Sequence, residues 1–248
     1  MMNLDGSVPA DQAELLGEDI KLMEQFSFNT TTDANIFGLS SLNRDSLIGW
    51  LSVRLGFIVG ENYQLAGSSV SLGSQKPAIF ADGITNMDNL GAVVYIAGRD
   101  SGKLYTLSIA GQMVPIKSPR VGLFRIGEGL FNYKKIGRTA PSAIGNRLLR
   151  LSTLLHEARH DDGNGSNTGM LHGTCTSGSL KGESACDKYS NGPYMIASAF
   201  LKACQQICDK QGCTSEEREG LKAYQADALS RLLPNATWLS DTRPEGFK

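Results

Sequence analysis

Residues 141–163 read PSAIGNRLLRLSTLLHEARHDDG, and the interpretation of the whole chain starts from this stretch. Apolar residues recur along it at intervals of three and four, which is the spacing of one face of an α-helix. Pro141 suits a first helical turn, and the run of two aspartates before Gly163 is typical of a helix end. We therefore predict a long helix over 141–160 whose apolar face packs into a core.

The last turn of this predicted helix carries an HExxH motif formed by His156, Glu157 and His160. Residues four apart lie on one face of a helix, so two imidazoles can hold one metal ion. Glu157 would lie where its carboxylate can take a proton from a zinc-bound water, whose pKa zinc lowers to about 7. The chain has only three histidines, and the third is His172, after a Gly-rich loop. We therefore predict a zinc site in the stretch that holds all three histidines, His156, His160 and His172.

The stretch HExxHxxG at 156–163 resembles the active-site helix of zincin metallopeptidases, in which the glycine turns the chain so that a third ligand can fold back. The metzincin branch places that ligand three residues after the glycine, where this chain has Ser166, so it departs from the metzincin pattern. The gluzincin branch uses a downstream glutamate, for which Glu183 lies at a comparable distance. His172 is the first choice for the third ligand, with Glu183 and Asp187 as alternatives.

The resemblance implies a zinc-dependent hydrolase, in the first place a metalloendopeptidase acting on a peptide or protein, with Glu157 as general base. A tyrosine often stabilises the oxyanion in such sites, and Tyr194 or Tyr189 could serve. By analogy, the substrate would lie extended along an edge strand, for which 103–110 and 121–126 are candidates. Two alternatives stay open: a non-catalytic binding or structural module with a structural metal, and a zinc amidase acting on cell-wall amide bonds.

Residues around the motif carry two further expectations. Arg159 would make an ion pair, either at the protein surface or with a group that contacts a metal ligand. Asp161 and Asp162 follow the helix C-terminus, where the helix dipole disfavours negative charge. They could orient a ligand histidine or bind calcium, although the acidic residue that should close a calcium loop is missing.

The resemblance implies an α+β, zincin-like fold, with a β-rich N-terminal part packed on the active-site helix and a helical C-terminal part. Residues 1–45 would be an N-terminal helix and a polar connector, and 46–248 a single catalytic domain, β-rich with the active-site helix over 46–160 and loop-rich and helical over 161–248. From the residue pattern we predict helices over 11–26, 193–209 and 215–233, a polar connector over 29–46, an ambiguous segment over 47–60, a hairpin of 90–97 with 103–110, and a strand over 121–126.

The five cysteines all lie in the last third of the chain. We expect disulfides between Cys175 and Cys186 and between Cys213 and either Cys208 or Cys204, with one spare thiol. Disulfides indicate an oxidising compartment, whereas five free thiols would indicate the cytosol. The N-terminus lacks a basic segment followed by an apolar one. We therefore expect a periplasmic or extracellular protein whose signal peptide has been removed.

Composition sets the remaining limits. The chain has 248 residues, is 41% hydrophobic and has a formal net charge of −1, which is the composition of an ordinary globular protein. The near-zero charge speaks against a nucleic-acid partner. No apolar run is long enough to span a membrane. The sequence does not indicate an oligomeric state.

Overall fold

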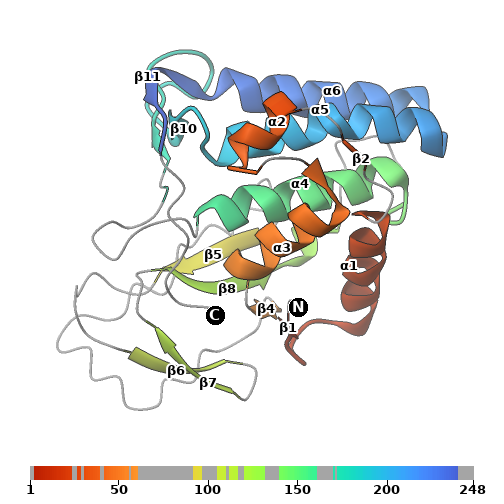
Figure 1. The fold of residues 1–248 in the computed structure, drawn as a ribbon, viewed down its shortest axis with the longest axis vertical. Coiled ribbons are helices and arrows are strands. Elements are labelled where there is room, and N and C mark those ends of the chain that lie inside the picture. The colour runs from red at the N-terminus through yellow and green to blue at the C-terminus, as the bar shows by residue number, and fades with distance from the viewer. Residues whose placement is uncertain are drawn as a thin grey trace.

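The computed structural model describes residues 3–23, 27–28, 31–39, 42–55, 57–60, 92–96, 105–109, 112–116, 120–131, 140–160, 170 and 172–239. They form a mixed α+β fold (Figure 1). The helices are α1 (Ala10–Leu22), α2 (Thr31–Ile36), α3 (Arg44–Arg54), the short 3-10 helix η3 (Glu128–Leu130), α4 (Ile144–His160), α5 (Pro193–Gln211) and α6 (Ser215–Ser230). The strands are β1 (Asn3–Leu4), β2 (Ser27–Phe28), β3 (Leu42–Asn43), β4 (Phe57–Val59), β5 (Ala92–Ile96), β6 (Tyr105–Ile109), β7 (Gln112–Ile116), β8 (Arg120–Ile126), β9 (Gly173–Thr174), β10 (Ser184–Tyr189) and β11 (Leu232–Thr237).

Helix α4 is the predicted long helix and ends at His160, as the sequence indicated. It runs through the middle of the molecule, with α5 and α6 on one side and strand β5 on another (Figure 1). Its leucines and Ala158 are buried in one hydrophobic core that also includes residues of α1, α3, α5 and α6. At its N-terminal half, Arg150 donates to Asp19 of α1 at 2.6 Å, and both side chains are fully buried. The helix is therefore fixed on several sides.

The largest sheet has the strand order β1-β4-β8-β5. Strands β1, β4 and β8 are parallel, and β5 is antiparallel at the edge next to β8. The strand predicted over 121–126 is confirmed as β8. It is paired on both sides, so the expectation that it is a substrate-binding edge strand is wrong.

The predicted hairpin of 90–97 with 103–110 is also wrong. Strand β5 pairs with β8, and β6 pairs with β7 in a separate two-stranded sheet. Only residues 110–111 separate β6 from β7, and a two-residue connection favours an antiparallel hairpin more than the longer 97–104 connection does. The other candidate for a substrate-binding edge strand, 103–110, contains β6, which lies in this separate sheet and pairs with β7.

The polar connector predicted over 29–46 is replaced by α2, a β2–β3 pair and the start of α3. Tertiary contacts explain the difference, because Phe37 is fully buried against Trp50, whose indole nitrogen donates to the Phe37 carbonyl at 3.1 Å. The ambiguous segment 47–60 contains most of α3 and then β4. The expected boundary at 45/46 falls inside α3, and buried residues on both sides of it share one core.

The C-terminal part confirms two predicted helices and corrects the end of one. Helix α5 begins at Pro193, and α6 begins with a capping box of Thr214 and Glu217. The chain leaves α6 after Ser230, and residues predicted as its last turn form β11, which is parallel to β10. Strands β11, β10 and β9 make a three-stranded sheet that the sequence analysis did not predict.

The cysteine predictions are confirmed. Disulfides join Cys175 to Cys186 and Cys208 to Cys213, and Cys204 is a free, buried thiol. Of the helices in the described ranges, none combines the length and apolar character that crossing a membrane would require.

Candidate metal centre

The described residues contain one group of side chains suited to a metal ion, formed by His156, His160 and His172. One ring nitrogen from each lies within 4.8 Å of the others. The Nε2 atoms of His156 and His160 are 3.3 Å apart. The His172 ring centroid lies 5.2 Å from that of His156 and 4.6 Å from that of His160. The three histidines of the chain therefore converge at one point.

Helix α4 presents the first two histidines from its last turn, and both ends of the helix are fixed. At the N-terminal end, the Gly145 backbone N–H donates to Glu217 Oε1 at 2.9 Å, and the same carboxylate accepts from Thr214 at the start of α6. Near the C-terminal end, Arg159 is 1% exposed and its Nε donates to the Asn191 carbonyl at 2.9 Å. The expected surface position of Arg159 is therefore wrong: the residue anchors the histidine-bearing turn.

Each ring also has a polar partner outside the cluster. His160 Nδ1 donates to the Met170 carbonyl, and His156 has a hydrogen bond with the Pro193 backbone. His172 Nδ1 lies 3.4 Å from Asp187 Oδ1. This is an ion-pair distance, and within the described part of the chain neither of these two atoms has a hydrogen bond. Such outer partners fix the tautomer of a ligand histidine and leave its other nitrogen for the metal.

The electrostatics also favour a neutral His156 ring. Burial, together with the neighbouring His172 and Arg231, holds the pKa of His156 well below its ordinary value, although the Pro193 backbone opposes this. Burial raises the pKa of Asp187, while its interaction with His172 lowers it. A neutral imidazole has the lone pair that a metal ligand needs.

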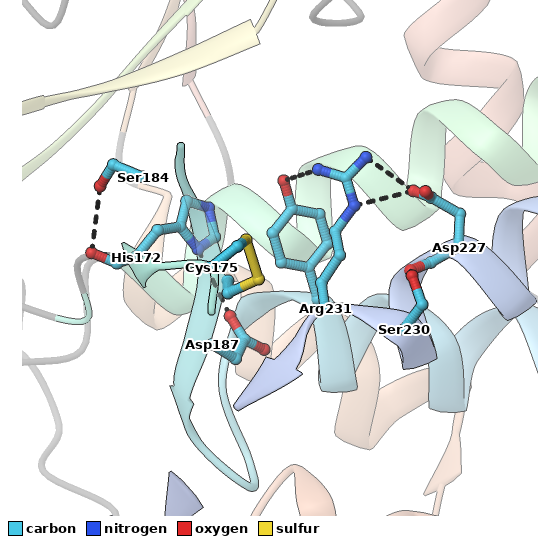
Figure 2. Close-up of a disulfide and its surroundings, with 9 residues drawn as sticks. His172, Cys175, Ser184, Asp187, Asp227, Ser230 and Arg231 are labelled. Atoms are coloured by element: carbon cyan, nitrogen blue, oxygen red, sulfur yellow. Dashed lines mark hydrogen bonds and ion pairs between the residues drawn. A yellow bond between two sulfur atoms is a disulfide. The ribbon is translucent and has the colours of Figure 1, made fainter. Parts of the chain in front are cut away.

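His172 is carried by a hairpin formed from β9 and β10. The Cys175–Cys186 disulfide closes this hairpin, and Figure 2 shows the ring of His172 next to Cys175 and facing Asp187. The Asp187 carboxylate is itself held by the Met195 backbone N–H of α5, at 3.1 Å from Oδ2. The hairpin, the disulfide and the start of α5 thus position the third histidine together.

Two further side chains with possible chemical roles border the cluster. Glu157 Oε1 lies 4.0 Å from His156 Nε2, and the Glu157 side chain is 15% exposed. Tyr194 stacks on the His172 ring at 4.7 Å between centroids and meets the His156 ring edge-on at 4.5 Å. Burial raises the pKa of Tyr194 to about 12, against the opposing effect of Arg231, so its hydroxyl keeps its proton at neutral pH.

The remaining predicted site residues lie elsewhere. Glu183 is exposed, at the turn before β10, and is not part of the histidine group. Asp187 lies behind His172 as its partner and is likewise absent from that group. Tyr189 is on β10, paired in register with Thr237. The expectations for Asp161, Asp162 and Ser166 concern positions outside the described residues.

The residues present fit a metal ion. Three imidazole nitrogens converge, their outer nitrogens are engaged elsewhere, and the His172–Asp187 pair has the arrangement known to orient ligand histidines. A three-histidine set suits zinc and also other divalent transition metals. Three protein ligands would leave a coordination position open, as in catalytic sites rather than closed structural ones.

Sequence reasoning missed three contributors to this site. The Met170 carbonyl and the Asn191 carbonyl act through the backbone, which no residue pattern reveals. Arg231, which contacts Tyr194, lies beyond the end of α6 and far from the motif in sequence. No protein-family model, curated protein or solved structure matches the chain. The geometry of the site is therefore the basis of the functional argument.

Proposed function

We propose that the protein is a zinc-dependent hydrolase that cleaves peptide bonds, with a site of the zincin type. The observation that carries this proposal is the convergence of His156, His160 and His172, with Glu157 bordering them. A closed structural site would need no carboxylate beside it. Glu157 is not a member of the ligand group but borders it, which is the position of a general base in such a site.

His156, His160 and His172 would hold the ion. When bound, zinc supplies Lewis acidity, which polarises a substrate carbonyl and makes water acidic near neutral pH. Glu157 accepts the proton of the water as that water forms its bond to the carbonyl carbon. It then delivers this proton to the leaving amine as the carbon–nitrogen bond breaks, so one carboxylate serves as base and acid in turn. Tyr194 donates a hydrogen bond to the carbonyl oxygen as negative charge builds on it.

The substrate would be an extended peptide. Strand β5 supports this part of the proposal, because among the described residues it is an edge strand of the largest sheet and lies next to α4. An extended chain can add to such an edge through backbone hydrogen bonds. The zincin-like description of the fold rests on the same features: a sheet with an antiparallel edge strand beside the helix that bears the motif.

An oxidising compartment is part of the proposal. Disulfides persist in the periplasm or outside the cell and are rare in the reducing cytosol. The Cys175–Cys186 and Cys208–Cys213 disulfides support export for this reason.

The decisive experiment compares wild type with Glu157→Gln. Wild type is expected to contain one zinc per chain by elemental analysis and to cleave unfolded casein. Glu157→Gln is expected to keep the zinc and to lose activity by about 10²–10⁴-fold, the usual contribution of a general base. Glu183→Gln is the matched control, since Glu183 is exposed and outside the ligand group. It should retain both zinc and activity.

The alternatives predict different outcomes. A structural metal module predicts that Glu157→Gln leaves every measurable property intact. A cell-wall amidase predicts that wild type releases soluble fragments from peptidoglycan but not from casein, with the same dependence on Glu157. Absence of stoichiometric zinc in wild type would rule out the whole proposal.

A further inference from the structure

Arg231 lies just beyond α6 with its side chain divided between two partners. Its Nε and Nη2 donate to Asp227 Oδ2 at 2.9 Å and 2.8 Å, and its Nη1 donates to the Tyr194 hydroxyl at 2.8 Å. Figure 2 shows the guanidinium of Arg231 held on one side by Asp227. The same guanidinium lies over the Tyr194 ring, 4.6 Å from its centroid. Arg231 is therefore fixed in orientation by a carboxylate and directed at a tyrosine of the histidine site.

The direction of the hydrogen bond has a consequence for Tyr194. A guanidinium carries only donors, so the phenol oxygen accepts from Arg231 and its own proton is not used in this contact. The hydrogen bond from Arg231 therefore leaves the Tyr194 O–H able to donate in another direction. The ring is held by its stacking on His172 and its edge contact with His156. A half-buried O–H whose proton is not engaged by Arg231 thus borders the metal cluster.

The positive charge of Arg231 makes the Tyr194 hydroxyl a stronger hydrogen-bond donor. A cation that donates to a hydroxyl oxygen withdraws electron density from the O–H bond, so the hydroxyl becomes a better donor to an anion. Asp227 holds the guanidinium in place but accepts from Nε and Nη2, whereas the tyrosine is bound by Nη1. The arrangement suits an anionic oxygen that binds among the histidines.

We propose that Arg231 is a positioning residue that holds the Tyr194 hydroxyl as a hydrogen-bond donor to an anionic oxygen at the three-histidine site. This rests on the proposed function, in which that oxygen belongs to the substrate carbonyl as it gains negative charge. Arg231 does not contact the substrate in this scheme. Its effect passes through Tyr194, and this distinguishes it from an arginine that merely joins α6 to α5.

The test is a double-mutant cycle on anion binding, which does not require a known substrate. The affinity of the zinc-loaded protein for acetohydroxamate is measured by calorimetry for wild type, Tyr194→Phe, Arg231→Met and the double variant. Each single substitution is expected to weaken binding about tenfold, the size of one hydrogen bond to a charged group. In the Tyr194→Phe background, Arg231→Met is expected to add no more than about a twofold loss, because the two residues act as one unit. Zinc content should stay at one per chain throughout.

Arg218→Met is the matched control, because Arg218 on α6 also faces an aspartate, Asp209 at 3.4 Å, and is half-buried. It should bind acetohydroxamate like wild type. If Arg231→Met does not fold, Arg231→Lys takes its place in the cycle, since lysine keeps the charge but not the forked geometry. The same coupling is then expected with a smaller first loss.

Additive losses in the cycle, or a wild-type affinity in Arg231→Met, would overturn the role of Arg231 and leave the proposed hydrolase intact. Coupled losses without any peptide hydrolysis would support that role and refute the hydrolase. A wild type without stoichiometric zinc would overturn both. These three results separate the failure of one proposal from the failure of the other.

Discussion

Helix α4 and the β9–β10 hairpin each carry part of the three-histidine group, and different forces hold them. The helix is surrounded by other elements: its leucines are buried in the main core, and its Arg150–Asp19 ion pair is fully buried. The hairpin is mostly exposed between Thr176 and Ser184. Its buried residues include the Cys175–Cys186 disulfide and Asp187. The hairpin is therefore held by a disulfide and by the polar contacts of Asp187, whereas the helix is held by a hydrophobic core.

This difference predicts which property each part of the site loses when it is destabilised. A buried helix opens only when the whole domain unfolds, whereas an exposed segment with few apolar contacts can open locally. Damage to the α4 side should therefore lower global stability and leave metal affinity unchanged in the folded protein. Damage to the hairpin side should lower metal affinity first. The following substitutions test that division, in order of expected size.

Asp19→Ala should have the largest effect, on global stability alone. It leaves the fully buried guanidinium of Arg150 without its carboxylate, and breaking a buried pair in this way costs about 3–5 kcal/mol of unfolding free energy. Urea denaturation followed by circular dichroism measures the loss, and zinc affinity of the folded fraction should match wild type. Glu18→Ala is the control, because the Glu18 pair with Lys21 is exposed. A loss under about 1 kcal/mol would show that α4 is not fixed by this pair.

Replacing Cys175 and Cys186 by alanine should come next and should act on the metal site. The disulfide closes a loop with a sequence separation of 11, and a loop of this size is stabilised by about 3 kcal/mol. Without the disulfide, the hairpin must be ordered when zinc binds, and part of the binding free energy is used for this. The apparent zinc affinity should therefore drop by at least about tenfold. A competition assay with a zinc-chelating dye measures the drop.

The Cys208–Cys213 disulfide is the matched control for this prediction. It closes the end of α5, away from the hairpin. Replacing both of its cysteines by alanine should reduce stability and leave zinc affinity unchanged. Equal losses of affinity in both double variants would mean that the hairpin does not open independently of the rest of the fold.

The same comparison explains what could be predicted from sequence. The positions of His156 and His160 follow from helical periodicity and a motif spacing of four, both local properties. Strand β10, which pairs with β9, also pairs with β11, and β11 is distant in sequence, so the segment resembled a loop. Helix α2 was missed for a similar reason, because six residues are too few to be stable alone and its burial depends on the core.

Asp187 illustrates the limit for the site itself. The sequence identified it as a possible ligand, since a carboxylate after the third histidine can bind zinc. Its actual position behind His172 depends on the Met195 backbone and on the closeness of Gly192. The sequence shows that Asp187 can interact with a metal or with a histidine. Only the fold shows that it contacts the ligand His172 instead of belonging to the ligand group.

Asp187→Asn should weaken zinc binding by about 10–100-fold, the usual cost of losing an outer partner of a ligand histidine. An asparagine side chain lacks the negative charge that lies 3.4 Å from His172 Nδ1. It has nearly the same size as aspartate, and its amide oxygen can still accept from the Met195 N–H. The melting temperature of the metal-free protein should change little. Glu183→Gln, on the same hairpin, should bind zinc like wild type. If Glu183→Gln lost zinc instead, Glu183 rather than His172 would be the third ligand.

Gly192→Ala should give the smallest effect, and it tests whether the position of Asp187 matters beyond its charge. Gly192 precedes α5 with φ −76°, which alanine can adopt. A Cβ there would, however, lie 2.6 Å from both Cγ and Oδ2 of Asp187 and 2.9 Å from the backbone carbonyl oxygen of Tyr189. The carboxylate must move, and its distance from His172 must change. We expect zinc affinity to fall by a few fold and no more than about tenfold, because the charge remains nearby.

The control for this substitution is Gly49→Ala in α3, where a Cβ meets nothing within 4 Å. It should stabilise the helix slightly and leave zinc affinity unchanged. Combining Gly192→Ala with Asp187→Asn then separates position from charge. If Gly192 acts only through Asp187, the double variant should bind zinc no more weakly than Asp187→Asn alone. Additive losses would mean that Gly192 supports the site by another route, such as the start of α5 and its Tyr194.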